Sequence, residues 1–171
     1  MIKIFTVLKD GEVLKKEVLE GILKQSVECC LIPITSKGTN VYSENNRRNN
    51  VLRAIDSNTE DYFFMIDSDV VIKNTDLIKN FFDEEKNSRT KVRTATTKGE
   101  NMNFCCYTPH ALILIMNDEV KNFKKWMEEF ELGDCDKKEN CIICKYLKNY
   151  MKNNLVLTIQ QNSTYETPRT I

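Results

Sequence analysis

The chain has 171 residues, of which 41% are hydrophobic, so it is long enough for one globular domain that buries roughly two-thirds of its extended surface. Basic and acidic residues number 25 each, so the formal net charge is zero, and the chain lacks the overall positive field that attracts nucleic acid or anionic lipid. Its apolar runs are shorter than the roughly 20 residues that span a bilayer, and the first residues show no leader pattern. From these two features we expect a cytoplasmic protein. The seven cysteines are an odd number and several lie in apolar runs, so we expect reduced thiols.

Strand and helix patterns alternate along the first 66 residues. Runs rich in apolar and β-branched residues predict strands over 2–8, 27–35 and 62–66. Apolar residues at helical spacing predict helices over 12–26 and 44–58, the second capped by Ser43. Because parallel strands require crossover connections, this alternation predicts a parallel α/β sheet, in which ligands bind at the carboxyl ends of the strands.

The second half mixes strands and helices less regularly. The expected elements are a helix over 74–87, a strand over 90–97, a strand over 101–116 that turns into a helix near Pro109, a long helix from Asp118 that breaks at Gly133, a helix over 140–151 and a strand over 154–160. The sequence therefore predicts an α/β fold with a mixed, mostly parallel central sheet flanked by helices, and leaves open whether the chain forms a homo-oligomer.

Two carboxylates follow the most apolar of the predicted strands, in the tripeptide Asp67-Ser68-Asp69. Carboxylates two residues apart can reach one hard cation when the chain turns between them, and Mg²⁺ or Mn²⁺ typically takes one or two carboxylates together with substrate phosphates. The same tripeptide is also a common turn at the end of a strand. The bare motif leaves both interpretations open.

Three segments in the first 75 residues resemble GT-A fold glycosyltransferases, in particular family 2-like members. "DYFFMIDSDVVI" is similar to the donor-site strand with its Asp-x-Asp motif, "ENNRRNNVLRAI" to a helix near the nucleotide-sugar, and "IKIFTVLKDG" to the first strand, whose end cups the nucleotide base. Further along, "FCCYTPHALILIMNDEVKNFKKW" and "NLVLTIQQNST" resemble the segment after the donor site and the closing strand. The resemblance implies a single Rossmann-like domain over 1–171, with a nucleotide-sugar donor half over 1–75 and an acceptor half over 76–171.

The resemblance also implies a metal-dependent, hexosyltransferase-type enzyme that uses a nucleotide-sugar, with UDP- and GDP-sugars the first donors to test. Asp67 and Asp69 would bind Mn²⁺ or Mg²⁺, and the metal would offset charge on the leaving diphosphate. Asp134 or Asp136 would act as the general base toward an acceptor hydroxyl of unknown identity, which gives inversion. The remaining donor-binding residues would be Thr6, Val7, Lys9, Arg47 and Ser68.

Other functions are weaker matches to the residues. A sugar nucleotidyltransferase typically has a glycine-rich phosphate loop after its first strand, whereas this chain has one glycine there, Gly11. A nucleotide-binding or interaction module with little or no turnover remains an alternative. We expect no nucleic-acid partner, because basic and aromatic residues are not interleaved.

Several residues that often bind metals have simpler interpretations. His110, the only histidine, follows a proline at the start of an apolar run and is expected to cap or pack. A zinc site at Cys135, Cys141 and Cys144 is disfavoured, because the isoleucines between the last two cysteines suit a helical core. Gln160 and Gln161 stand where several relatives have a metal-binding histidine, so a metal would be held by fewer protein ligands.

Overall fold

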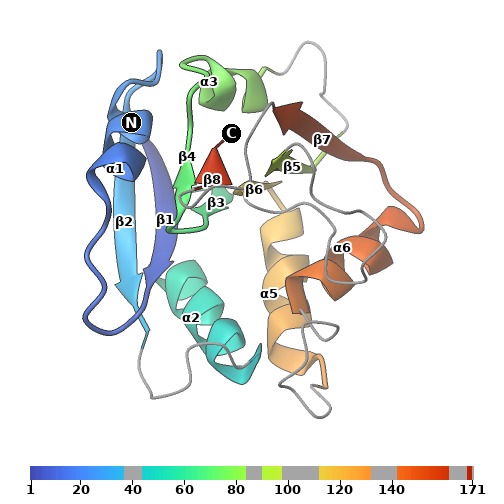
Figure 1. Ribbon diagram of the computed structural model, residues 1–171. Coiled ribbons are helices and arrows are strands. Elements are labelled where there is room, and N and C mark those ends of the chain that lie inside the picture. Colours follow the sequence, from blue (N-terminus) through green and yellow to red (C-terminus); the bar gives the residue numbers. More distant parts are fainter. Residues whose placement is uncertain (37–43, 84–89, 98–111, 132–141, 162–168, 171) are drawn as a thin grey trace.

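The computed structural model describes residues 1–36, 44–83, 90–97, 112–131, 142–161 and 169–170 (Figure 1). Its strands are β1 (Ile2–Leu8), β2 (Cys29–Thr35), β3 (Tyr62–Ile66), β4 (Val70–Val71), β5 (Val92–Thr97), β6 (Leu112–Met116), β7 (Val156–Gln161) and β8 (Arg169–Thr170). Its helices are α1 (Lys16–Leu23), α2 (Glu44–Ser57), α3 (Leu77–Phe81), α5 (Glu119–Glu129) and α6 (Ile142–Met151).

Six strands form one central sheet in the order β2-β1-β3-β6-β5-β7, and β4 pairs with β8 in a separate short sheet. Strand β1 pairs in parallel with β2 and β3, and β5 pairs in parallel with β7. Strand β6 is antiparallel to both of its neighbours, β3 and β5. The predicted mixed, mostly parallel sheet is therefore confirmed, with β6 as the reversed strand.

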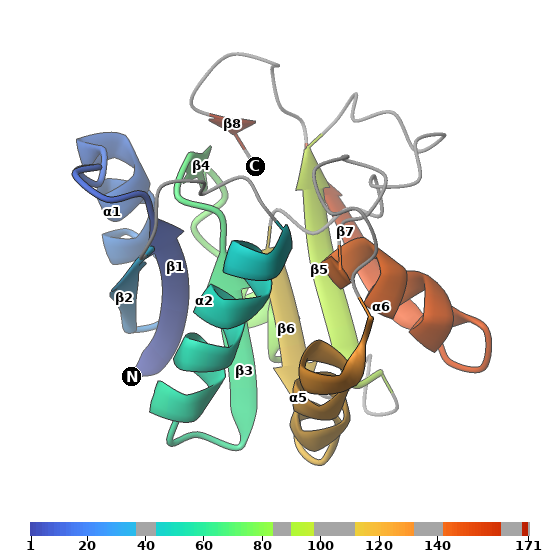
Figure 2. The same cartoon turned by 90° about the horizontal axis from the view of Figure 1, so that it is seen from below.

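Helices cover both faces of this sheet (Figure 2). On one face, α2, α5 and α6 pack against the sheet through a core that includes Val51, Phe123 and Leu147. On the other face, α1 and α3 pack through a core that includes Ile22 and Phe81. Both faces of the central strands are thus removed from water, which explains why these strands are almost continuously apolar.

The predicted helix near Pro109 is wrong for residues 112–116, which form β6. Leu112 and Leu114 belong to the core beneath α1 and α3, whereas Ile113 and Ile115 belong to the core beneath α2, α5 and α6. A short run that is apolar throughout fits a strand buried on both faces as well as a helix, and periodicity alone does not separate the two. Pro109 itself lies outside the described residues.

The first helix is shorter than the sequence predicted, because α1 begins at Lys16 rather than at residue 12. Residues 9–15 instead form a loop, in which Glu12 N donates to Lys9 O at 2.9 Å and Gly11 adopts a φ of 77°. Val13 is 83% exposed here, so it cannot serve the apolar face of a helix as its spacing suggested. This loop joins β1 to α1 at the carboxyl end of β1.

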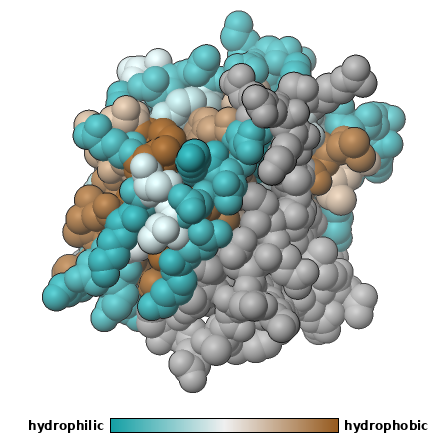
Figure 3. Space-filling model, turned by 90° about the horizontal axis from the view of Figure 1, so that it is seen from above, coloured by the Kyte–Doolittle hydropathy of each residue, from teal (hydrophilic) through white to brown (hydrophobic). Residues whose placement is uncertain are grey.

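On the part of the surface that is coloured in Figure 3, apolar residues (brown) lie among hydrophilic ones (teal). Among the described residues, the large apolar side chains left exposed are those of Met1, Val13, Leu19, Leu23, Met151 and Leu155. Scattered apolar residues of this kind are normal on a globular protein and need no partner. None of the helices in the described ranges has the length and apolar composition needed to span a membrane.

Candidate functional site

The Asp-x-Asp motif forms a turn between two strands. Asp67 follows β3 directly, and Val70 N, at the start of β4, donates to Asp67 O at 3.3 Å. Asp67, Ser68 and Asp69 are half-buried, and all three line a cavity of about 480 Å³. The turn and the ligand-site interpretations of this tripeptide are therefore compatible, because the turn places both carboxylates at one cavity.

The cavity lies at the carboxyl ends of β1, β2 and β3, the three neighbouring parallel strands. Val7 and Lys9 come from the end of β1 and the loop after it, and Ser36 directly follows β2. Helix α2 adds Arg47, Asn50 and Val51, and α6 adds Ile143. This is the position at which an open α/β sheet binds its ligands, since the connections diverge there and leave a crevice.

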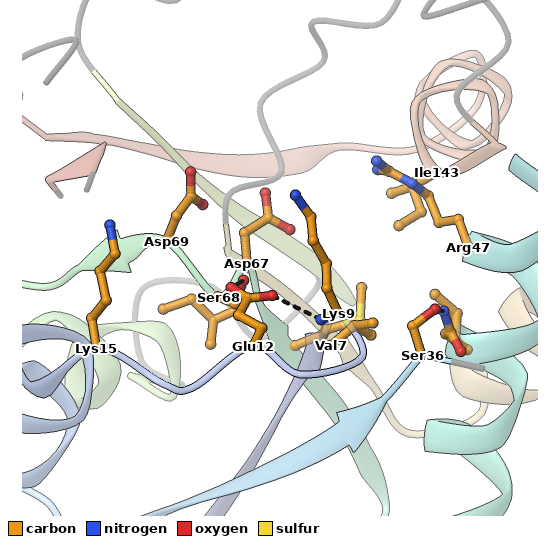
Figure 4. Close-up of a pocket in the computed structure, with 14 residues that line it drawn as sticks. Val7, Lys9, Glu12, Lys15, Ser36, Arg47, Asp67, Ser68, Asp69 and Ile143 are labelled. Atoms are coloured by element: carbon orange, nitrogen blue, oxygen red, sulfur yellow. Dashed lines mark hydrogen bonds between the residues drawn. The ribbon is translucent and has the colours of Figure 1, made fainter. Parts of the chain in front are cut away.

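Among the described residues that line the cavity, acids and bases are equal in number. The basic residues are Lys9, Lys15 and Arg47, and the acidic residues are Glu12, Asp67 and Asp69. In Figure 4 the side chains of Asp67, Asp69, Lys9 and Arg47 extend to the same side of the strand ends. An anionic ligand at this place would meet cationic groups, and a divalent cation would meet carboxylates.

Glu12 connects the loop after β1 to the Asp-x-Asp turn (Figure 4). Its Oε2 accepts a hydrogen bond from Lys9 N at 2.7 Å, and its Oε1 accepts one from Ser68 Oγ at 3.1 Å. The positive φ of Gly11 reverses the chain just before Glu12, a conformation that glycine adopts without the strain a side chain would add. Two segments 56 residues apart in the sequence are thus held together at the cavity.

A second polar network ties α2 to the end of β2. Ser36 N continues the ladder with a 2.7 Å hydrogen bond to Leu8 O, and Asn50 Nδ2 donates to Ser36 Oγ at 3.0 Å. Arg53 Nη1 donates to Thr35 O at 2.7 Å. Because Ser36 and Asn50 are almost completely buried, this pair fixes one wall of the cavity.

Most of the donor-binding residues predicted from the sequence meet at this cavity, namely Val7, Lys9, Arg47, Asp67, Ser68 and Asp69. Thr6 does not line it. Side chains alternate along β1, so Thr6 lies on the same face as Ile4, which packs beneath α1. Thr6 is fully buried, and its Oγ1 has no hydrogen-bond partner among the described residues.

The predicted bases Asp134 and Asp136 lie outside the described residues, as do His110, Cys135 and Cys141. Cys144 is buried in α6 within the apolar core. In the part of the chain that the structure describes, no group of three or more His, Cys, Asp or Glu side chains could hold a metal ion. Backbone pairing places Gln160 and Gln161 at the end of β7, opposite Thr96 and Thr97.

Other described residues, which the sequence did not single out, also line the cavity: Glu12, Lys15, Ser36, Asn50, Val51, Met65, Ile66 and Ile143. Ser36 could have been found, because it follows a predicted strand and such positions line ligand sites in parallel sheets. Glu12 and Lys15 were assigned to a helix, which hid their place in the loop. Ile143 gave no signal, since a core position on a helix looks the same whether or not it borders a cavity.

The chain matches no protein-family model and no curated protein. Solved structures are similar to it. One is a glycosyltransferase involved in glycosylation of the major capsid of PBCV-1, with a TM-score of 0.59 and 13% identity over 93% of this chain and 81% of that one. Another, from Desulfovibrio desulfuricans G20, is named as a nucleotide-diphospho-sugar transferase, with a TM-score of 0.52 and 10% identity over 94% and 80% of the two chains.

A third similar structure is a CMP:2-keto-3-deoxy-manno-octonic acid synthetase in complex with CTP. Its TM-score is 0.55 at 8% identity, and the match covers 98% of this chain and 92% of that one. The fold is GT-A-like. At such low identity the likeness establishes the fold alone, and the chemistry has to be argued from the residues of the cavity.

Proposed function

We propose that this protein is a metal-dependent glycosyltransferase that moves a sugar from a nucleotide-diphosphate-sugar to an acceptor hydroxyl. The observation that supports it best is the meeting of Asp67 and Asp69 with Lys9 and Arg47 at one cavity, at the carboxyl ends of parallel strands. The GT-A-like fold of the similar structures adds to it.

Asp67 and Asp69 are the residues that would hold the metal, with diphosphate oxygens and water filling the other positions. Oxygen ligands of this kind suit Mg²⁺ and Mn²⁺, which usually retain several non-protein ligands. When bound, the ion supplies positive charge that stabilises the departing nucleoside diphosphate. Lys9 and Arg47 would contact the same phosphates, and Arg47 can do so with two parallel hydrogen bonds.

The proposed reaction inverts the anomeric centre of a hexosyl donor, a UDP- or GDP-sugar. Asp134 or Asp136, in the acceptor half over 76–171, takes the proton of the acceptor hydroxyl as general base. A base at this step makes the oxygen a better nucleophile just as the bond to the diphosphate breaks. The donor half over 1–75 contains the remaining machinery.

Two alternatives use the same cavity differently. A sugar nucleotidyltransferase, the class of the synthetase that binds CTP, would join a nucleoside triphosphate to a sugar and release pyrophosphate. The loop between β1 and α1 contains one glycine, Gly11, rather than a glycine-rich phosphate cradle, which favours sugar transfer. A nucleotide-binding module would bind the donor without turnover.

The first test measures the thermal midpoint against UDP-, GDP-, CMP- and dTDP-sugars, with and without Mn²⁺. A ligand at about 100 times its Kd stabilises the native state by about 2.7 kcal/mol, which is about 5 to 10 °C for a chain of this size. Asp67→Asn and Asp69→Asn should each abolish the metal-dependent part of the shift, because the amide loses the charge that binds the ion.

Asp61→Asn is the matched control, since Asp61 is an exposed acid at the opposite end of β3. It should behave like the wild type. A shift that needs no metal and survives both substitutions would contradict metal dependence, and no shift with any donor would refute the donor site. Once a donor is identified, the product separates the three functions. Release of nucleoside diphosphate indicates sugar transfer or donor hydrolysis, and release of pyrophosphate from a nucleoside triphosphate indicates nucleotidyl transfer. Release of neither product indicates a binding module.

A further inference from the structure

Glu12 is a third acidic residue at the cavity, and its carboxylate is held there. The residue is exposed and could extend into water, yet both of its oxygens are engaged, by Lys9 N at 2.7 Å and by Ser68 Oγ at 3.1 Å. Ser68 lies between Asp67 and Asp69, so the hydrogen bond brings a third negative charge to the turn that already has two.

This third charge brings the net charge of the described residues that line the cavity to zero. Lys9, Lys15 and Arg47 are balanced by three acids when Glu12 is included, and exceed the acids by one when it is left out. A free nucleoside diphosphate has about three negative charges at neutral pH, so it gains no net attraction from a neutral lining. A divalent cation on the diphosphate lowers that charge to about one and adds the partner that the carboxylates require.

We propose that Glu12 is a charge-selecting residue, which disfavours metal-free nucleoside diphosphates so that the cavity takes up the diphosphate as its complex with a divalent cation. The inference rests on the proposed function, because it concerns the same donor site. It assigns to Glu12 a task different from that of Asp67 and Asp69: they bind the ion, and Glu12 repels a donor that lacks it.

The hydrogen bonds suggest a competing, purely structural task, in which Glu12 only ties the loop to the turn. Two variants separate these tasks. Glu12→Gln removes the charge and can keep both contacts, because its carbonyl oxygen can accept from Lys9 N while its amide group donates to Ser68 Oγ. Ser68→Ala removes the contact with Ser68 and keeps the charge, which Lys9 N still holds through its 2.7 Å hydrogen bond. Glu17→Gln makes the same change at an exposed position on α1 that does not line the cavity, and serves as the matched control.

The experiment measures the Kd of UDP and of GDP by calorimetry, once with Mn²⁺ and once with EDTA, and compares the variants by the ratio of the Kd in EDTA to the Kd with Mn²⁺. A unit charge several ångströms away in a water-like medium changes an equilibrium constant by a factor of about three. Free and metal-bound diphosphates differ by about two charges, so Glu12→Gln should lower the ratio by about tenfold. The gain in metal-free binding should shrink at high salt, because mobile ions screen the charge.

The ratio should stay at the wild-type value in Glu17→Gln and close to it in Ser68→Ala, because Ser68 has no charge and Lys9 N still holds the Glu12 carboxylate. An unchanged ratio in Glu12→Gln would overturn the inference, and so would an equal fall in Ser68→Ala, since that result would show that the tie rather than the charge matters. In both cases wild-type binding with Mn²⁺ leaves the proposed function standing. If the wild type binds neither nucleotide under either condition, the proposed function fails and this inference fails with it.

Discussion

Gly21 lies where α1 meets the chain just after the Asp-x-Asp turn, and replacing it with alanine should destabilise the protein. A Cβ at Gly21 would lie 2.9 Å from Ile72 O and 3.0 Å from Ile72 N, whereas ordinary contacts begin near 3.4 Å. Both neighbours are backbone atoms, so no side-chain rotation relieves the contact. Gln25 also holds the segment after Ile72 close to α1, because its Nε2 donates to Asn74 O at 3.0 Å and its Oε1 accepts from Ile78 N at 3.1 Å.

The expected size follows from two opposing terms. Alanine is favoured over glycine inside a helix by about 1 kcal/mol. Forcing an extra methyl group into a packed interface typically costs about 1 to 3 kcal/mol, and the upper part of that range applies to Gly21 because the contacts are with backbone held by Gln25. The net destabilisation should be about 1 to 2 kcal/mol, or a thermal midpoint lower by about 3 to 6 °C for a chain of this length.

Urea denaturation of Gly21→Ala against the wild type tests this expectation. Gly11→Ala is the companion variant, since a methyl group at Gly11 would meet no atom within 4 Å, but the residue has a φ of 77°. Its loss should be about 1 kcal/mol and come from backbone strain alone. If Gly21→Ala is as stable as the wild type or more stable, the free energy gained from alanine in the helix exceeds the cost of the close contact with Ile72. The close packing inferred for α1 would then be wrong.

Two further predictions concern stability. Burial raises the pKa of Cys29 from 9.0 to about 11, so the unfolded chain loses this proton first and the free energy of unfolding should fall as pH rises from about 9 to about 11. Urea denaturation at several pH values in this range should show that the free energy of unfolding falls by up to about 2 kcal/mol less in Cys29→Ala than in the wild type. If it falls equally in both proteins, the raised pKa of Cys29 is wrong. Tyr146 Oη donates to the buried Glu119 carboxylate at 2.5 Å, so Tyr146→Phe should cost about 1.5 to 3 kcal/mol in urea denaturation. A loss below about 0.5 kcal/mol would show that the bond adds little.

The elements of the first 75 residues could be predicted well because their signals are local. Three apolar strands separated by two helices imply a parallel sheet, and Asp67 and Asp69 follow the third strand directly. The carboxyl-end rule then places them where a ligand binds. Arg47 was found by resemblance, and its position on α2 brings it to the same cavity. The roles of Asp134 and Asp136 stay predictions.

What the sequence determined by itself was the presence and order of most elements, since periodicity and turn residues act over a few neighbouring positions. The direction of β6 was decided by tertiary structure, because a uniformly apolar strand fits either orientation and only its neighbours β3 and β5 select one. The balance of charges among the described residues that line the cavity was decided there too. Glu12 reaches Ser68 across 56 residues of sequence, and no local pattern encodes a hydrogen bond that exists only after the sheet has brought both segments to one edge.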